Sequence, residues 1–447
     1  MKKIVIASLL MFNGFLSAQT NPAITQWLRN TTGITGRHYV SGNSTPITDA
    51  VAANVQTVQY STNWVYVTTN GIPAYITGPF LDGNPSLATT RNNAIFKFPL
   101  SPTQNTGTAT ATSGGNIGLF KNGVALFDYR DGVSYKFSTG ANAGGPLGGA
   151  GDGIWNRDAV VAERVGFDCA KAHPAMGNYH HHQNPSAFSL DLQVISTVCS
   201  TYPSDGLYVI NTTQHSPLLG FAYDGFPIYG AYGYANADGT GGIVRMKSGY
   251  QLRNITTRTV YADGTNVTDG PAVSTTFPLG LYREDYEWIA HASDASYLDV
   301  HNGRFCVTPE YPSGIYCYFT TVDANHNSAY PYVVGPTFYG NKTGGTATIS
   351  ESTTQYTLAN ADFNLSKLNV KVYPNPAQEF IAIQSDMIED NLKVTLIDEL
   401  GKVIQTNEIL QGSTLCIMDL TTVYNGIYFV RIANAKDNKT FKIIVNK

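Results

Sequence analysis

The stretch Leu219-Gly-Phe-Ala-Tyr-Asp-Gly-Phe-Pro-Ile-Tyr-Gly230 sets an Asp-Gly pair between two short apolar runs. Such a pair favours the tight turn of a β-hairpin. Asn122-Gly-Val-Ala-Leu-Phe127 shows the same order of turn and strand about a hundred residues earlier, as a duplicated β fold would. Further Asn-Gly pairs begin at Asn70 and Asn302. The pattern predicts a large β-rich domain, a β-sandwich or barrel-like fold, over residues 20–345.

The composition is typical of a mainly β extracellular protein. Of 447 residues, 12% are aromatic and only 13% are charged, with 43 glycines and 28 tyrosines. A chain of this length exceeds one ordinary core, so two or three folded units are expected. A net charge of -4 offers no basic surface for a phosphate backbone, which excludes nucleic acid as a partner. Weak helical periodicity is confined to Asp158–Arg164.

The N-terminal segment has the three parts of a secretory signal peptide. Lys2 and Lys3 precede an apolar run from Ile4 to Leu16, and the small residue Ala18 follows. The run is shorter than the roughly 20 residues that span a bilayer, and no later apolar run is longer. We expect cleavage of residues 1–19 and a mature protein with no transmembrane segment.

The C-terminal part of the chain changes character near residue 368. Short alternating runs separated by turn signals predict a small Ig-like β-sandwich over residues 368–447. The stretch before it, residues 346–367, is rich in Thr, Ser, Asn and Ala and is predicted to be a linker. An unrelated fibronectin-like module is the alternative for the terminal strands.

Four ordered motifs in this terminal part resemble the C-terminal sorting domain of type IX secretion cargo. They are the Tyr-Pro-Asn-Pro-Ala opening at 373–377, the Gly-Lys pair at 401–402, the Asn-Gly-Ile-Tyr-Phe-Val strand at 425–430, and a basic terminal strand ending at Lys447. The resemblance implies that the type IX secretion machinery is a partner. It also implies a secreted or cell-surface protein on the outer-membrane side of a bacterium.

Four of the nine histidines fall within ten residues, at His173, His180, His181 and His182. On an extended strand His180 and His182 share one face, whereas Tyr179 and His181 share the other. Two imidazoles about 6 to 7 Å apart can bind copper or zinc when a third ligand such as His173 joins them. The alternative is a hydrogen-bonded Tyr/His network that needs no metal.

The histidine segment also carries a family resemblance. Asp168-Cys-Ala-Lys-Ala-His173 and Gly177-Asn-Tyr-His-His-His-Gln-Asn-Pro185 resemble the signature of the YHYH proteins, named for a Tyr-His-Tyr-His string. Further matches at 219–230, 298–304, 308–318 and 330–336 make the resemblance strongest over residues 60–340. It implies no established reaction.

Two departures from the family pattern bear on the site. His181 replaces a tyrosine in the first string, residues 179–182, but it faces away from the predicted pair. The second string, residues 316–319, reads Tyr-Cys-Tyr-Phe and has no histidine. Cys317 then either coordinates a softer, more copper-like site or forms a bridge with Cys306. His301 is a possible compensating ligand.

Five cysteines leave at least one thiol unpaired. Cys416 stands alone in the terminal domain and is expected to be a buried core residue. The other four can form Cys169–Cys199 and Cys306–Cys317, although the sequence leaves other pairings open. A reversal through Pro309, Pro312 and Gly314 favours the second bridge.

Three functions compete. The first is a metal-binding protein that uses His180 and His182 with His173 or His301. The second is an adhesion or glycan-binding module whose tyrosines contact extracellular polymers without metal. The third is a metal-dependent enzyme, although no motif names a reaction. Tyr179, Tyr316 and Asp224 are further site candidates, and Asp224 is first of all a turn residue.

Overall fold

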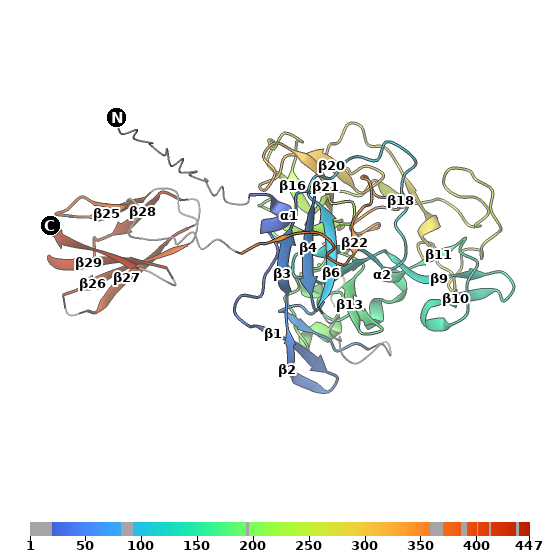
Figure 1. Ribbon diagram of the computed structural model, residues 1–447, viewed down its shortest axis with the longest axis horizontal. Coiled ribbons are helices and arrows are strands. Elements are labelled where there is room, and N and C mark those ends of the chain that lie inside the picture. The colour runs from blue at the N-terminus through green and yellow to red at the C-terminus, as the bar shows by residue number, and fades with distance from the viewer. Residues whose placement is uncertain are drawn as a thin grey trace, which may run out of the picture. The chain divides into compact units, whose positions relative to one another are not determined.

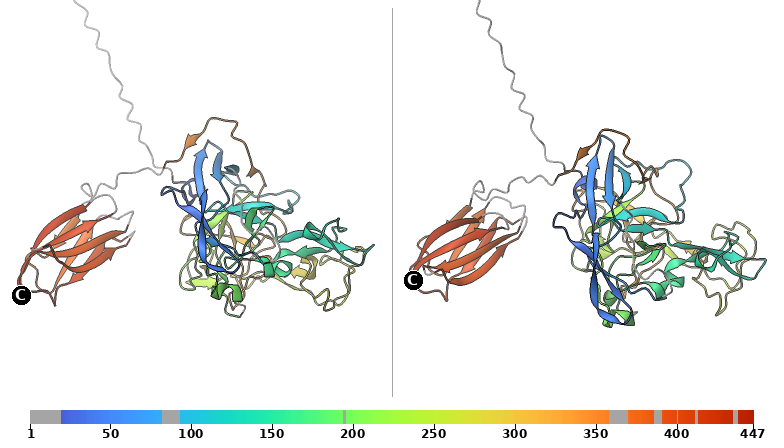
Figure 2. Two further views of the ribbon diagram at one scale, coloured as in Figure 1. Left: turned by 90° about the horizontal axis from the view of Figure 1, so that it is seen from below. Right: turned by 60° about the horizontal axis from the view of Figure 1, so that its bottom comes forward.

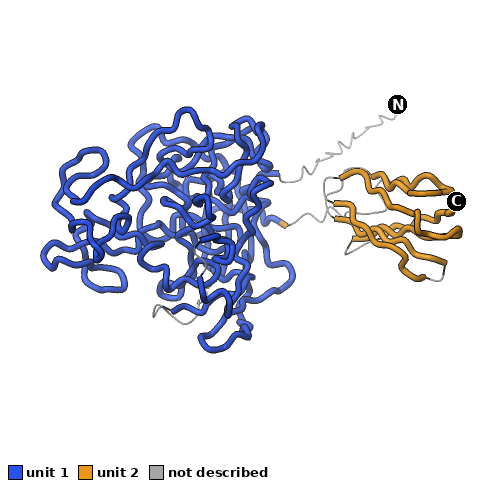
Figure 3. The backbone as a smooth tube through the Cα atoms, turned by 180° about the vertical axis from the view of Figure 1, so that it is seen from behind, with its two compact units in different colours: residues 1–356 blue, residues 357–447 orange. Residues whose placement is uncertain are grey.

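The computed structural model describes residues 20–81, 93–193, 196–357, 370–385, 391–399, 401–410, 413–434 and 438–447. The chain divides into two compact units, residues 1–356 and 357–447 (Figure 3). The predicted signal peptide, residues 1–19, lies outside the described residues. Within the described part of the chain, no helix has the length and apolar character needed to cross a membrane.

The first unit is built around a mixed sheet of eight strands. Its order is β12 (His173–Ala175), β13 (Asn178–His181), β8 (Ala125–Phe127), β7 (Asn116–Phe120), β14 (Leu218–Ala222), β15 (Pro227–Tyr229), β21 (Ile315–Phe319) and β20 (Gly303–Cys306). The turns at Asn122-Gly123 and Asp224-Gly225 join β7 to β8 and β14 to β15, as predicted. Gly123 and Gly225 have φ values of 81° and 89°, which side chains rarely adopt.

The two halves of this sheet repeat one arrangement. In each half, the second strand of a hairpin pairs with a parallel strand. Strand β8 of the β7–β8 hairpin pairs with β13, and strand β15 of the β14–β15 hairpin pairs with β21. An antiparallel edge strand, β12 or β20, completes each half. The halves meet where β7 pairs with β14. The echo between residues 122–127 and 224–229 is therefore part of a duplicated topology.

A second sheet of five strands packs against the first. Its order is β22 (Gly345–Thr346), β6 (Ala94–Pro99), β4 (Trp64–Thr69), β3 (Val55–Tyr60) and β23 (Thr354–Gln355). Figure 1 shows β3, β4 and β6 side by side. Trp27 bridges the two sheets, since its ring lies 5.4 Å from both Phe98 on β6 and Phe221 on β14.

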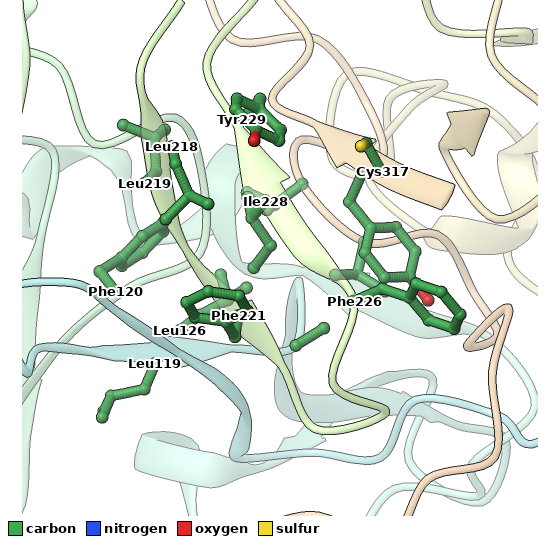
Figure 4. Packing of buried hydrophobic residues seen from close by; sticks show 14 of the residues in the cluster. Leu119, Phe120, Leu126, Leu218, Leu219, Phe221, Phe226, Ile228, Tyr229 and Cys317 are labelled. Atoms are coloured by element: carbon green, nitrogen blue, oxygen red, sulfur yellow. The ribbon is translucent and has the colours of Figure 1, made fainter. Parts of the chain in front are cut away.

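The main core fills the space between these sheets. Leu119, Phe120 and Leu126 from one half of the large sheet and Leu218, Leu219, Phe221 and Ile228 from the other are fully buried in one cluster (Figure 4). Val58, Val67 and Phe96 join the cluster from the five-stranded sheet. Burial of such side chains stabilises the fold by about 1.5–3 kcal/mol each relative to exposure. The duplicated halves thus share a single core.

The expected linker is shorter than its composition indicated. Residues 345–346 pair with β6 and residues 354–355 pair with β3, so both edges of the five-stranded sheet come from this segment. Strand edges accept any chain that offers backbone N–H and C=O groups, and the Thr/Ser-rich composition does not reveal such pairing. Residues 358–367 of the predicted linker lie outside the described residues.

Smaller elements surround the two large sheets. The strands are β1 (Thr35–Val40), β2 (Asn43–Ala52), β5 (Ile76–Thr77), β9 (Arg130–Lys136), β10 (Ala141–Gly144), β11 (Asn156–Asp158), β16 (Tyr232–Tyr234), β17 (Ile243–Arg245), β18 (Tyr250–Leu252) and β19 (Tyr286–Trp288). The helical segments are α1 (Pro22–Thr25), α2 (Ala159–Ala162), η1 (Gly145–Leu147), η2 (Arg164–Gly166), η3 (Phe188–Leu190), η4 (Thr197–Ser200) and η5 (Arg283–Asp285). Figure 2 shows the β1–β2 hairpin, in blue, extending from the edge of this unit.

Helix α2 confirms the weak periodicity seen at 158–164. The Asp158 carboxylate caps its first turn by accepting hydrogen bonds from the backbone N–H groups of Val160 and Val161. Val160 is buried in the main core, and the helix ends at the C-cap residue Glu163. This short helix therefore fixes the position of Glu163.

The second unit is a small sandwich of the predicted Ig-like kind. One sheet contains β24 (Val370–Tyr373), β25 (Phe380–Ser385) and β28 (Leu415–Asp419). The other contains β27 (Val403–Ile409), β26 (Leu392–Asp398), β29 (Gly426–Ala433) and β30 (Asn438–Val445). Alternate residues of these strands form a separate core that includes Cys416. The mainly β prediction is confirmed, and no sheet among the described residues closes into a barrel.

The cysteines differ from the prediction at one pair. Cys169 and Cys199 form a disulfide with Cα atoms 5.3 Å apart, whereas Cys306, Cys317 and Cys416 are buried free thiols. The predicted Cys306–Cys317 bridge is not formed in the structure, and the register places Cys306 opposite Ile315 and Cys317 opposite Arg304. The two cysteines are therefore diagonal neighbours and not a directly opposed pair, and their thiols interact without a covalent bond.

We expect the double substitution Cys169→Ala with Cys199→Ala to lower the free energy of unfolding by about 2–4 kcal/mol, because the bridge restricts a loop of some thirty residues in the unfolded chain. Urea denaturation of the purified protein measures this change. The Cys416→Ala variant is the control and should leave unfolding of the first unit unchanged. Equal stability of the double variant and the parent would contradict the bridge.

Candidate metal centre

The site begins at the β12–β13 hairpin, whose register brings two histidines together. His173 on β12 stands directly opposite His180 on β13, and His182 follows on the same face. The turn uses Met176 and Gly177 with φ values of 48° and 84°, the left-handed pair that a two-residue hairpin requires. The hairpin alone therefore places three imidazoles on one side of the sheet.

The three imidazoles converge on one point. One ring nitrogen from each of His173, His180 and His182 lies within 4.8 Å of the others, and all three side chains are buried. The Nε2 atoms of His180 and His182 are only 2.9 Å apart. Two nitrogens bound to one tetrahedral zinc lie about 3.3 Å apart, given metal–nitrogen distances of about 2.0–2.1 Å. These three residues, called the His trio below, thus have the spacing of a metal site.

The opposite nitrogens of the two rings have partners that assign their protons. His180 Nδ1 lies 2.8 Å from the carbonyl oxygen of Asn178, and His182 Nδ1 lies 2.5 Å from that of Asp128. A carbonyl can only accept, so each Nδ1 carries a proton, and in a neutral imidazole this is the only proton on the ring nitrogens. The two Nε2 lone pairs consequently face each other, which is repulsive unless a cation lies between them. Hydrogen bonds of this kind also orient metal-bound histidines.

Glu163 adds a carboxylate to the His trio. Its Oε2 atom lies 3.3 Å from His173 Nε2 and 3.6 Å from His182 Nε2. One negative charge beside three neutral imidazoles offsets part of the charge of a divalent ion. The sequence reasoning missed Glu163 because it lies ten residues before His173, at the end of a different element.

Aromatic rings enclose the site. Phe127 stacks on His180 with ring centroids 3.7 Å apart, and Phe167 meets His173 edge-on at 4.8 Å. Burial lowers the pKa of His182 to about 4, although the charge of Glu163 acts in the opposite direction. Burial, aided by His182 and His173, holds the pKa of His180 well below its usual range. Neutral imidazoles have the lone pairs that metal binding needs.

The other face of β13 holds a hydrogen-bonded network. His181 Nε2 lies 2.7 Å from the Tyr75 hydroxyl, and the Tyr179 hydroxyl donates to Asp168 Oδ2 at 2.8 Å. Both strand residues point away from the His trio, as strand alternation predicts. Tyr179 therefore belongs to a hydrogen-bonded network of the predicted Tyr/His kind, which lies on the opposite face of β13 from the His trio.

Asp168 anchors this network and the start of β12. Its carboxylate accepts hydrogen bonds from the backbone N–H groups of Gly78, Ala170 and Ala172 as well as from Tyr179. In the other half of the sheet, Asp299 accepts from the N–H groups two and four residues later and from the Tyr316 hydroxyl, in the same pattern. Tyr316 is thus the counterpart of Tyr179.

The duplication identifies the counterpart of the His trio. The positions correspond when Asp168 is matched to Asp299 and Tyr179 to Tyr316. Arg304 then takes the position of His173, Cys317 that of His180, and Phe319 that of His182. Arg304 lies over the Phe319 ring at 5.8 Å, so a cation–π contact occupies this second position. Cys317 is not part of the His trio.

Two further candidates lie apart from the His trio. His301 Nδ1 faces the hydroxyl and the carbonyl of Thr337, at 2.8 and 3.1 Å. The Asp224 carboxylate accepts from the Tyr318 hydroxyl at 2.6 Å and from the backbone N–H of Gly340 at 2.9 Å. Asp224 therefore fixes its own turn against neighbouring strands.

Comparison with known proteins gives two family matches. The family model described as YHYH protein matches residues 95–330. The model described as secretion system C-terminal sorting domain matches residues 371–446, which marks the protein as secreted or cell-surface cargo of a type IX system. No curated protein matches the chain.

One similar solved structure is PorZ, an essential bacterial surface component of the type IX secretion system of Porphyromonas gingivalis. The sequence identity is 12% and the TM-score is 0.21. The alignment covers 91% of this chain and 53% of PorZ, so this chain spans about half the length of PorZ.

We expect Asp168→Ala to lower the free energy of unfolding by about 3 kcal/mol or more, because it leaves several buried donors without an acceptor. Asp168→Asn should cost less, since its amide oxygen still accepts from the backbone. Urea denaturation compares both with Asp299→Ala, the equivalent change in the other half. An Asp168→Ala variant within about 0.5 kcal/mol of the parent would refute the anchoring role.

Proposed function

The chain belongs to the YHYH protein family and has a type IX sorting domain at its C-terminus, and from this premise we propose that it is an exported protein that binds one divalent transition metal. The ligands are His173, His180 and His182, with Glu163 at the same point. The supporting observation is the 2.9 Å approach of two Nε2 atoms whose ring protons are held elsewhere by backbone carbonyls.

The donor set favours zinc or copper(II) among the common ions. Imidazole nitrogens suit borderline metals, and a single carboxylate is compatible with both. Magnesium and calcium prefer oxygen ligands and fit a site of three nitrogens poorly. Among the described residues no cysteine joins the His trio, and Cys317 belongs to the other half of the sheet, which disfavours a site specialised for copper(I).

The surroundings suit firm retention of the ion. All three imidazoles are buried, and Phe127 and Phe167 contact the rings of His180 and His173. Sites of this kind contribute the free energy of metal binding to the stability of the fold. We therefore assign the metal a stabilising role in the duplicated sheet and assign no reaction to it.

Adding zinc or copper(II) to metal-free protein should raise its melting temperature. At a free metal concentration of 100 times the dissociation constant, the gain is about 2.7 kcal/mol. Elemental analysis after dialysis should give one metal per chain, and His180→Ala with His182→Ala should abolish both effects. The matched control, His301→Ala, should retain them. No thermal shift and no retained metal in the parent protein would refute the proposal.

Glu163→Gln tests the carboxylate separately, because glutamine keeps the shape and removes the charge. We expect metal affinity to fall about 10–100-fold while the apo protein keeps its stability. Competition with a chelating dye measures the affinity, and Glu287→Gln on β19 serves as the control. An unchanged affinity would exclude Glu163 from the site.

A further inference from the structure

Two adjoining cavities in the first unit are not explained by the metal site. Their volumes are about 730 and 430 Å³, the size range of pockets for small organic ligands. They share Tyr250, Tyr286 and Tyr330 as common lining residues. Helix α2 separates the larger cavity from the His trio, since Val160 and Val161 line the cavity.

The shared tyrosines form an aromatic wall. Tyr286 and Tyr330 are stacked with centroids 4.1 Å apart at 9°, and Tyr250 meets Tyr330 edge-on at 5.3 Å. Tyr250 and Tyr286 are half-buried and line both cavities. A flat ring with a hydroxyl offers both an apolar face and a hydrogen bond, which suits a sugar ring.

The larger cavity carries positive charge. Arg164, Arg245 and Lys247 line it with a single carboxylate, that of Asp323. The Asp323 carboxylate accepts hydrogen bonds from the backbone N–H groups of Asn325 and Asn327, so it is used within its own loop. An anionic ligand is therefore favoured in this cavity.

Three contacts define how Arg245 and Lys247 are held. Arg245 donates from Nη1 to the Val322 carbonyl at 2.6 Å, which fixes one edge of its guanidinium group. Lys247 lies 2.9 Å from Asp294 and over the Tyr297 ring at 4.9 Å.

The buried hydroxyl of Ser328, another lining residue, has no hydrogen-bond partner among the described residues. A ligand oxygen would satisfy it.

The smaller cavity differs in charge. Its Arg130 is paired with Asp128 at 2.6 Å, and its Arg283 lies 3.1 Å from Glu284. The carboxylates of Asp263 and Glu284 line this cavity together with the two arginines, so its lining carries no net charge and favours an uncharged group. The two cavities thus differ in the ligand that they favour, although they share one aromatic wall.

We propose that these cavities bind two successive units of an acidic extracellular polysaccharide. The larger cavity holds a carboxylated or sulfated sugar against Arg245 and Arg164, and the smaller cavity holds a neutral sugar. The chain crosses the tyrosine wall between them. This binding is separate from the metal site, since no member of the His trio lines either cavity.

Isothermal titration of the full chain tests the proposal with three probes of equal length: a uronic-acid oligosaccharide, a sulfated oligosaccharide and a neutral one. We expect at least one acidic probe to bind more tightly than the neutral probe and to weaken as salt is added. Preference for one acidic probe identifies the anionic group. Failure of both acidic probes to bind, or equal binding of the neutral probe, would overturn the proposal.

Substitutions locate the binding. Arg245→Ala should weaken the acidic probe at least ten-fold, whereas Arg245→Lys should retain most of the affinity. Tyr286→Leu, which removes the flat face but keeps apolar volume, should weaken binding as well. Lys247→Gln, at a half-exposed position, gives a second charge test if Arg245→Ala does not fold. Unchanged affinity in a folded charge variant would exclude this cavity.

Two controls separate the proposal from general charge and from the metal site. Arg37→Ala removes an exposed cation on β1, outside both cavities, and should leave the affinity unchanged. His180→Ala with His182→Ala should also leave it unchanged. Loss of sugar binding in the histidine variant would contradict the independence of the two sites, whereas loss of metal binding alone would not.

Discussion

The central sheet depends on one interaction that occurs in both of its halves, the hydrogen bonds of an aspartate that precedes the edge strand. This aspartate is the buried Asp168 in one half and the half-buried Asp299 in the other. Asp168 and Asp299 each accept from two backbone N–H groups of their own turn and from a tyrosine hydroxyl on the neighbouring strand. These bonds fix the register of β12 on β13 and of β20 on β21. A slip of one residue would move His173 to the opposite face, so the convergence of the His trio depends on this anchor.

Strand alternation then divides the chemistry between two faces. In β13 the tyrosine and His181 point toward the aspartate network, which leaves His180 and His182 on the face of His173. In β21 the same alternation sends Tyr316 and Tyr318 to Asp299 and Asp224. Tyr179 and Tyr316 thus have the same role in the two halves, whereas the other face carries three imidazoles in one half and Arg304, Cys317 and Phe319 in the other.

Local sequence patterns predict the turns and the shared face of the two histidines, but they do not predict contacts between distant segments. The Asn122 and Asp224 turns, the shared face of His180 and His182, and the short helix after Asp158 all follow from neighbours a few residues apart. Glu163, the Asp128 carbonyl and the β22 and β23 strands depend on contacts between distant segments, which no local period encodes. The Cys306–Cys317 bridge was predicted from the reversal between them, but the register, which sequence spacing does not fix, makes them diagonal.

Helix α2 connects the two proposed sites, and its length determines how they relate. Glu163 at its end contacts the His trio, while Val160 and Val161 in its body and Arg164 just beyond it line the larger cavity. The buried Asp158 carboxylate caps this four-residue helix, and Val160 is packed in the main cluster, so the core holds the helix at both points. A ligand at one site can change the affinity of the other site only if the ligand binds differently to two arrangements of the element that connects the sites. The packing of Val160 and the cap at Asp158 hold α2 in place, and we therefore expect the two proposed sites to bind their ligands independently.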